Sequence, residues 1–171
     1  MYIFTVVTVL ALTLLGASAS ATPSGGRVRL YVELGSGTIT STVQDVTTSV
    51  GKVIGTPIAQ GTTSGSQIAA APPPPCGPNA GSAVTGSVTT TAADGSELTF
   101  SLNGTVCVSA VTSSYTRYLV TSTVTVTGGT GKFANATGGG KQFSVVTLYP
   151  TGDGTQGPFV SFLHGFIRLA G

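Results

Sequence analysis

The sequence is poor in ionisable side chains. Charged residues make up 7% of the 171-residue chain, against roughly 25% in an average soluble protein. Trp is absent, and there is one Met and one His. The seven Lys and Arg residues are scattered singly, and the formal net charge is only +2. Because nucleic-acid binding needs a clustered basic face, the composition argues against a nucleic-acid partner.

The same shortage limits catalysis. A Ser-His-Asp arrangement could form only around His164, which lies in an apolar segment and is interpreted first as a structural histidine. The acidic residues and the single His show no metal-ligand spacing, so neither a metal nor another cofactor is expected. Turns account for three of the five acids, which leaves Glu33 and Asp45 with no sign that they lie close together.

The N-terminal segment predicts export. Residues 6–15 are almost uninterruptedly apolar, and residues 17–21 are small, with A-x-A cleavage signals after Ala19 and Ala21. The apolar run is shorter than the roughly 20 residues that a spanning helix needs. We therefore expect residues 1–21 to be a signal peptide, and residues 22–171 to form one secreted, extracellular domain that is not held in a membrane.

Two cysteines remain in the mature chain, Cys76 and Cys107. In an oxidising compartment an isolated pair is most simply one disulfide. It would close a loop of about 30 residues and stabilise the fold by about 3 kcal/mol in the chain-entropy model. A nucleophilic or metal-binding thiol is the alternative, but it lacks support without further His or Cys residues.

Alternation of apolar and polar residues predicts an all-β fold. The Thr-, Ser- and Val-rich composition suits pleated strands, and Gly supplies the turns. Asp94-Gly95 is a strong hairpin signal, and no helix is predicted. Eight strands are expected, which favours an antiparallel barrel, since closure hides the edges of an uncharged sheet. They are residues 27–34, 38–46, 51–59, 84–91, 97–110, 115–126, 143–149 and 159–169.

Two segments depart from simple alternation. Residues 60–82 include four consecutive prolines, which favour polyproline II, and are interpreted as a Pro-rich surface loop tied down at Cys76. The last predicted strand, 159–169, is apolar on both faces. Such a strand must be covered from outside the sheet, for which another subunit is a candidate.

The Gly-rich segment 127–140 lacks the Lys-Ser/Thr ending of a phosphate-binding loop, and its glycines suit positive φ angles in a turn. Residues 128–138, Gly-Gly-Thr-Gly-Lys-Phe-Ala-Asn-Ala-Thr-Gly, resemble the signature of the dirigent and allene-oxide-cyclase-like barrel proteins. The resemblance implies an eight-stranded antiparallel barrel, often trimeric. Plant dirigent proteins are secreted and glycosylated, and they direct the coupling of phenoxy radicals without oxidising them. The pocket motifs of plant dirigents are not found here, so no pocket residue is carried over.

Three hypotheses follow. The first is a secreted dirigent-like barrel that binds a small apolar or aromatic molecule and steers its coupling by positioning. The second is a non-catalytic extracellular structural protein that forms a dimer or trimer. The third is a cyclase- or isomerase-type enzyme, disfavoured by the shortage of ionisable residues. The candidate polar lining of the pocket is Tyr31, Asp45, Tyr115, Arg117 and His164. Asn103 and Asn135 begin N-glycosylation sequons.

Overall fold

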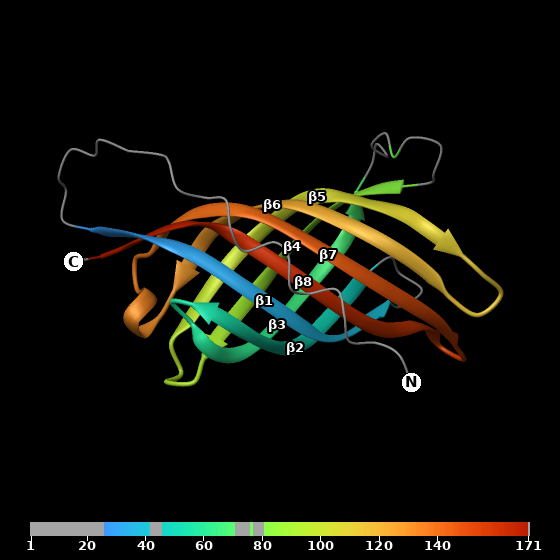
Figure 1. Cartoon of the computed structure of the whole chain (residues 1–171), viewed down its shortest axis with the longest axis horizontal. Helices are drawn as coiled ribbons and strands as arrows, with labels where there is room; N and C mark the ends of the chain where they lie inside the picture. The colour runs from blue at the N-terminus through green and yellow to red at the C-terminus, as the bar shows by residue number, and fades with distance from the viewer. Residues whose placement is uncertain (1–25, 42–45, 71–75, 77–80, 171) are drawn as a thin grey trace, which may run out of the picture.

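The computed structural model describes residues 26–41, 46–70, 76 and 81–170. Eight strands form a closed antiparallel barrel in which each strand pairs with its neighbours in the sequence and β8 returns to β1 (Figure 1). The predicted all-β, eight-stranded antiparallel barrel is therefore confirmed. The elements are β1 (Arg27–Ser41), β2 (Val46–Thr56), β3 (Ala59–Ala70), β4 (Gly81–Ala92), β5 (Glu97–Val111), β6 (Thr116–Gly129), the 3-10 turn η1 (Gly131–Phe133), β7 (Thr137–Thr151) and β8 (Gly154–Leu169).

The predicted break between residues 34 and 38 is wrong, because β1 continues through it as one strand. The two glycines there meet a crowded interior instead of forming a turn. A Cβ atom on Gly35 would collide with the Ser161 hydroxyl, and one on Gly37 would collide with the carbonyl oxygen of Val50. The Ser161 hydroxyl can rotate away, whereas the Val50 carbonyl is main chain, so glycine is needed at position 37 for the close approach of β1 and β2.

The predicted loop at 60–82 is also wrong over much of its length. Residues up to 70 belong to β3, which pairs with both β2 and β4, and β4 already begins at Gly81. The strand was hidden because Gly, Thr and Ser fill both of its faces, so it has almost no apolar alternation. Main-chain pairing on both sides stabilises such a strand without an apolar signal. Residues 71–75 and 77–80 of the predicted loop lie outside the described residues.

Cys76 and Cys107 form the predicted disulfide. Cys107 lies on β5, opposite Gly81 at the start of β4. The Cys76 sulfur also lies 3.7 Å from the carbonyl oxygen of Val106. The bond thus ties the connection between β3 and β4 to the barrel wall.

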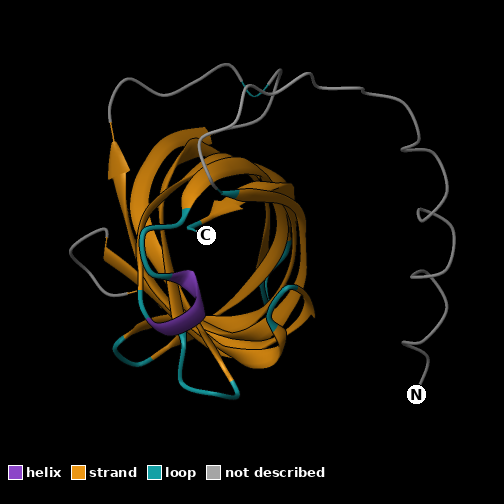
Figure 2. Ribbon diagram, turned by 90° about the vertical axis from the view of Figure 1, so that its left-hand side faces the viewer, coloured by secondary structure: helices purple, strands orange, loops and turns teal. Residues whose placement is uncertain are grey.

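The barrel is filled from one end. The larger core cluster includes Ile58 from the β2–β3 turn and Phe133 from η1, and both side chains are almost completely inaccessible. We call this the η1 end. Figure 2 views the barrel from this side, with η1 lying across it. A smaller cluster of Ile39, Val120, Val146 and Phe159 lies toward the other end, which we call the far end.

The Gly-rich segment closes the η1 end by docking on the β4–β5 turn. The Thr130 amide donates to the Glu97 carbonyl at 2.9 Å, and the Glu97 amide donates back to Thr130 Oγ1 at 3.1 Å. The Lys132 amide donates to Ser96 Oγ at 3.2 Å. Gly131 has a φ of 55°, a left-handed conformation in which glycine is favoured. The segment therefore has a structural role: it places Phe133 in the core.

The strand β8 is apolar on both faces, as predicted. Phe159, Leu163 and Ile167 are buried in the barrel, whereas Val160 and Phe166 are 59% and 60% exposed on the outside.

In β1 the polar pair Tyr31 and Glu33 faces the interior of the barrel, whereas the apolar side chains of Leu30 and Leu34 are exposed on the outside.

Candidate binding site

Two adjacent cavities lie inside the barrel. The inner chamber has a volume of about 40 Å³ and the outer chamber, toward the far end, about 210 Å³. Four side chains line both chambers, namely Ile39, Gln67, Val120 and Val146. The alternation of each strand brings these side chains inward, and the chambers lie between the filled η1 end and the far end.

The outer chamber has mainly apolar walls. The chamber is partly open to the surface, and Ile68, one of its lining residues, is 54% exposed. Among the described residues, Tyr118 is the aromatic side chain that lines it. The remaining lining residues, besides the four shared ones, are Ser41, Thr47, Ala69, Ser82, Val84, Val106 and Leu148. An apolar cavity of this kind suits an apolar ligand.

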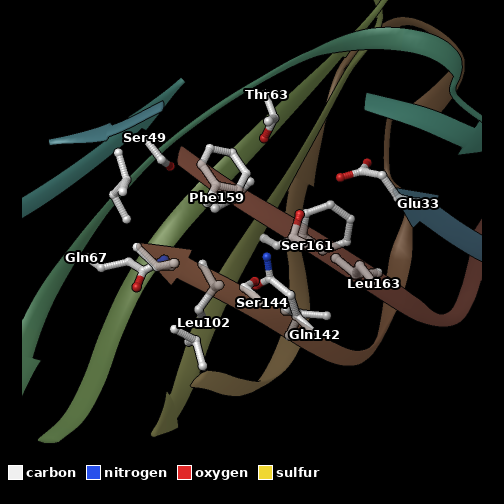
Figure 3. A pocket seen from close by; sticks show the side chains of 16 residues that line it. Glu33, Ser49, Thr63, Gln67, Leu102, Gln142, Ser144, Phe159, Ser161 and Leu163 are labelled. Carbon is white, nitrogen blue, oxygen red and sulfur yellow. The ribbon is translucent and has the colours of Figure 1, made fainter. Parts of the chain in front are cut away.

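The inner chamber has mixed walls, with nine apolar lining residues, and seven polar side chains from five strands also face it (Figure 3). They are Glu33, Ser49, Thr63, Gln67, Gln142, Ser144 and Ser161. Apart from Glu33, these side chains hydrogen-bond to none of the residues that the structure describes. Their donors and acceptors therefore remain available to a ligand or to solvent.

Glu33 is the ionisable group of the inner chamber, and only 5% of it is exposed. The Tyr31 hydroxyl donates to Glu33 Oε2, and Thr90 Oγ1 donates to the same oxygen at 3.2 Å. Burial raises the pKa of Glu33, and the two hydrogen bonds offset part of that increase. Burial, followed by the nearby Glu33 charge, raises the pKa of Tyr31. The Tyr31 ring also packs edge-on against Phe100, with centroids 5.4 Å apart.

Of the four predicted lining residues that the structure describes, Tyr115 and Arg117 lie together, and none of the four lines either chamber. Tyr31 faces the interior of the barrel but lines neither chamber. Asp45 lies outside the described residues. The Arg117 side chain is exposed on the outer surface, with its guanidinium 5.5 Å from the centroid of Tyr115. His164 also lies on the outer face, between two phenylalanine rings. It is stacked 6.2 Å from Phe143 and 5.4 Å from Phe162. Ligand binding by these residues stays a prediction.

Sequence reasoning missed Glu33, Gln67 and Gln142 as lining residues. The available signal was the pair Tyr31 and Glu33, which share the face of β1 opposite its row of apolar residues. An apolar row ordinarily marks the buried face of a strand. In this barrel the apolar row of β1 lies outside.

Two further predictions concern the surface and metals. Asn103 on β5 and Asn135 after η1 are both exposed, as expected for glycosylation acceptors, and their modification stays a prediction. Within the described ranges, no group of His, Cys, Asp and Glu side chains could hold a metal ion. No helix in the same part of the chain has the length and hydropathy to cross a membrane.

The comparisons with known proteins identify one similar fold. No protein-family model matches the sequence, and no curated protein matches it. A solved structure of a pterocarpan synthase dirigent protein is similar to this chain, with 13% identity and a TM-score of 0.44. The match covers 91% of this chain and 98% of that chain. The barrel is established by the pairing of its own eight strands.

Proposed function

We propose that this chain is a secreted, dirigent-like barrel that binds a small apolar or aromatic molecule in its outer chamber. The observation that carries the proposal is the cavity of about 210 Å³, which has apolar walls and reaches the surface at the far end. An apolar cavity of about 150 Å³ holds a benzene molecule, so a ligand of one or two rings fits this volume.

The interior favours positioning over acid–base chemistry. Within the described residues, Glu33 is the one carboxyl group that lines either chamber, and its hydrogen-bonded neighbour Tyr31 has a raised pKa. Acid–base catalysis generally pairs groups whose pKa values lie near the working pH. The ligand is therefore held and oriented, and any coupling that it undergoes is steered by its orientation.

One observation supports secretion. The disulfide between Cys76 and Cys107 is of a kind that persists in oxidising compartments. The predicted signal peptide, residues 1–21, lies outside the described residues. Mass analysis of the protein recovered from the medium of a secreting host tests this part, since cleavage after Ala19 or Ala21 is expected.

A pair of neighbouring substitutions tests ligand binding. Val120 lines both chambers, whereas the next residue on β6, Thr121, is exposed on the outer surface. We expect Val120→Phe to fill the junction of the chambers and to weaken binding at least tenfold, whereas Thr121→Phe should leave affinity unchanged. Binding of benzyl alcohol and 2-naphthol would be measured by titration calorimetry and native mass spectrometry. Equal affinity in the wild type and both variants would place the ligand elsewhere.

A second function, oligomerisation, is favoured by an apolar face outside the barrel. We define the apolar face as the outward residues Leu30 and Leu34 of β1, Phe143 and Val145 of β7, and Val160, Phe162 and Phe166 of β8. The pairing places Leu34 beside Phe162, and Phe162 beside Phe143, so the face is continuous across three strands. Large exposed apolar patches mark interaction sites.

We propose that this face joins copies of the chain into a dimer or trimer. Light scattering after size exclusion would measure the mass, and the double variant Phe143→Ser/Phe166→Ser should be monomeric. Val111→Ser, at a residue 69% exposed outside the apolar face, serves as the control and should keep the wild-type mass. A monomeric wild type at micromolar concentration would refute the second function and leave the first untouched.

A further inference from the structure

We propose that the ligand is a small apolar molecule that carries a protonated amine, and that its ammonium group lies in the inner chamber against the free carboxylate oxygen of Glu33. The inference rests on the proposed function, because the apolar part of the same molecule would occupy the outer chamber. It adds a charge requirement that a purely apolar pocket would not impose.

The geometry leaves one oxygen of Glu33 available. Tyr31 and Thr90 both donate to Oε2, and Oε1 accepts no hydrogen bond from a described residue. The carboxyl group points toward the middle of the inner chamber in Figure 3. The hydroxyls of Thr63 and Ser161 line the same chamber. An ammonium group has three donors and no acceptor, so a set of oxygen acceptors suits it.

No Lys or Arg side chain of the described residues faces this carboxyl group. On the two strands beside β1, Gly55 of β2 and Leu163 of β8 pair with Glu33. From farther across the barrel, β4 contributes the hydroxyl of Thr90, and Tyr31 is the titratable side chain that contacts Glu33. All seven Lys and Arg side chains lie in the described part of the chain and are exposed. Within the described residues, the inner chamber therefore holds an acid without a countercharge.

A buried carboxylate without a partner is unfavourable. It can either stay protonated or meet a cation, and a cationic ligand supplies the partner that the fold lacks. The same group disfavours an anionic ligand, since two buried like charges repel. A neutral alcohol offers a single O–H donor and gains no ion pair. The inner chamber thus discriminates ligands by charge.

The volumes of the two chambers indicate which part of the ligand each one holds. About 40 Å³ holds a few water-sized groups, which suits an ammonium head but not a ring. The ring belongs in the outer chamber of about 210 Å³. Gln67 lines both chambers and lies where the linking carbon atoms would pass. The probes are therefore benzylamine and 2-phenylethylamine, with benzyl alcohol as the neutral match and benzoate as the anionic match.

The amine should bind more tightly as the pH rises through the pKa of Glu33. Burial raises that pKa in the free protein, so at lower pH the group must release its proton before it can pair with an ammonium ion. Affinity for the amine then falls again above the pKa of the amine itself. Benzyl alcohol carries no charge, so its affinity should not rise over the same pH range.

The preference for an amine is tested by titration calorimetry of the wild type, Glu33→Gln and the control Glu97→Gln. Glu97, at the start of β5, is an acid outside both chambers. The wild type and Glu97→Gln should bind benzylamine at least tenfold more tightly than benzyl alcohol, and benzoate more weakly than either. In Glu33→Gln the ratio of the amine to the alcohol should fall to about one.

Several outcomes would overturn the inference. One is a wild type that binds benzyl alcohol as tightly as benzylamine, and another is a Glu33→Gln variant that keeps the preference. If that variant fails to fold, the pH series on the wild type still decides, because an amine affinity that does not rise with pH contradicts the pairing. Binding of the alcohol without any amine preference refutes the inference alone, whereas failure of all the probes to bind refutes the proposed function.

Discussion

Replacing Phe133 with Ala should show how strongly the η1 end supports the fold. The side chain has no exposed surface and belongs to the larger core cluster, together with Leu98 and Ile167. Truncation of a buried Phe to Ala typically lowers the free energy of unfolding by about 3–5 kcal/mol. The variant also loses the contact between the ring and the Lys132 ammonium, which lies 5.2 Å from the ring centroid. Because Lys132 is exposed, this contact adds no more than about 0.5–1 kcal/mol.

This loss is a large fraction of the roughly 5–15 kcal/mol that holds a typical domain folded. Urea unfolding followed by far-UV circular dichroism is the suitable assay, since the chain has no Trp for fluorescence. Val111→Ala truncates a side chain that is 69% exposed and outside the apolar face, and it should change stability by less than about 1 kcal/mol. If the two variants lose equal stability, Phe133 does not close the barrel as described.

Three other predictions concern pH, the disulfide and an exposed ion pair. Because burial raises the pKa of Glu33, the folded state holds its proton more strongly than the unfolded state, so stability should fall as pH rises from about 4.5 through the raised pKa. Thermal melts should show this slope in the wild type, and its persistence in Glu33→Gln would contradict the assignment. Reduction of the Cys76–Cys107 bond, 31 residues apart, should destabilise the fold by roughly 3–4 kcal/mol and add two hydrogens to the mass. An unchanged mass would leave two free thiols. The Lys132 ammonium, 2.9 Å from Asp94, together with a backbone amide, lowers the pKa of Asp94 to about 2. The stabilisation of the fold by this ion pair should therefore persist above about pH 4 and disappear as pH falls toward 2. An NMR titration that gives Asp94 an ordinary pKa would disprove the contact.

The strand count was predicted correctly, but partly for the wrong reason. The predicted strands 27–34 and 38–46 divide β1 at Gly35 and Gly37, and no predicted strand corresponds to β3, so one extra strand offsets one missing strand. Both errors have the same origin. Glycine in a sequence signals a turn, whereas in a tightly closed barrel it also marks places where neighbouring main chains approach too closely for a Cβ atom.

The binding site was less predictable than the fold, because the inward and outward faces of a strand depend on closure. Alternation shows that Tyr31 and Glu33 share a face, but it does not show which face is inside. The apolar row of β1 looked like the buried face, yet Leu30 and Leu34 are exposed. His164 was predicted to be a structural histidine in apolar surroundings. Its stacking on Phe143 and Phe162 confirms the apolar surroundings, but these three rings lie on the outer surface of the barrel.

The arrangement separates stability from binding along the barrel. The larger core cluster, with Phe133 and Ile58, fills the η1 end, whereas the far half contains the smaller cluster and the outer chamber. Unfilled volume in the far half means lost packing contacts there, and a ligand that enters it restores them. A ligand present at 100 times its dissociation constant would add about 2.7 kcal/mol to the free energy of unfolding. We therefore expect a bound amine to raise the melting temperature of Phe133→Ala, because the truncated core and the outer chamber lie at opposite ends of the same closed sheet.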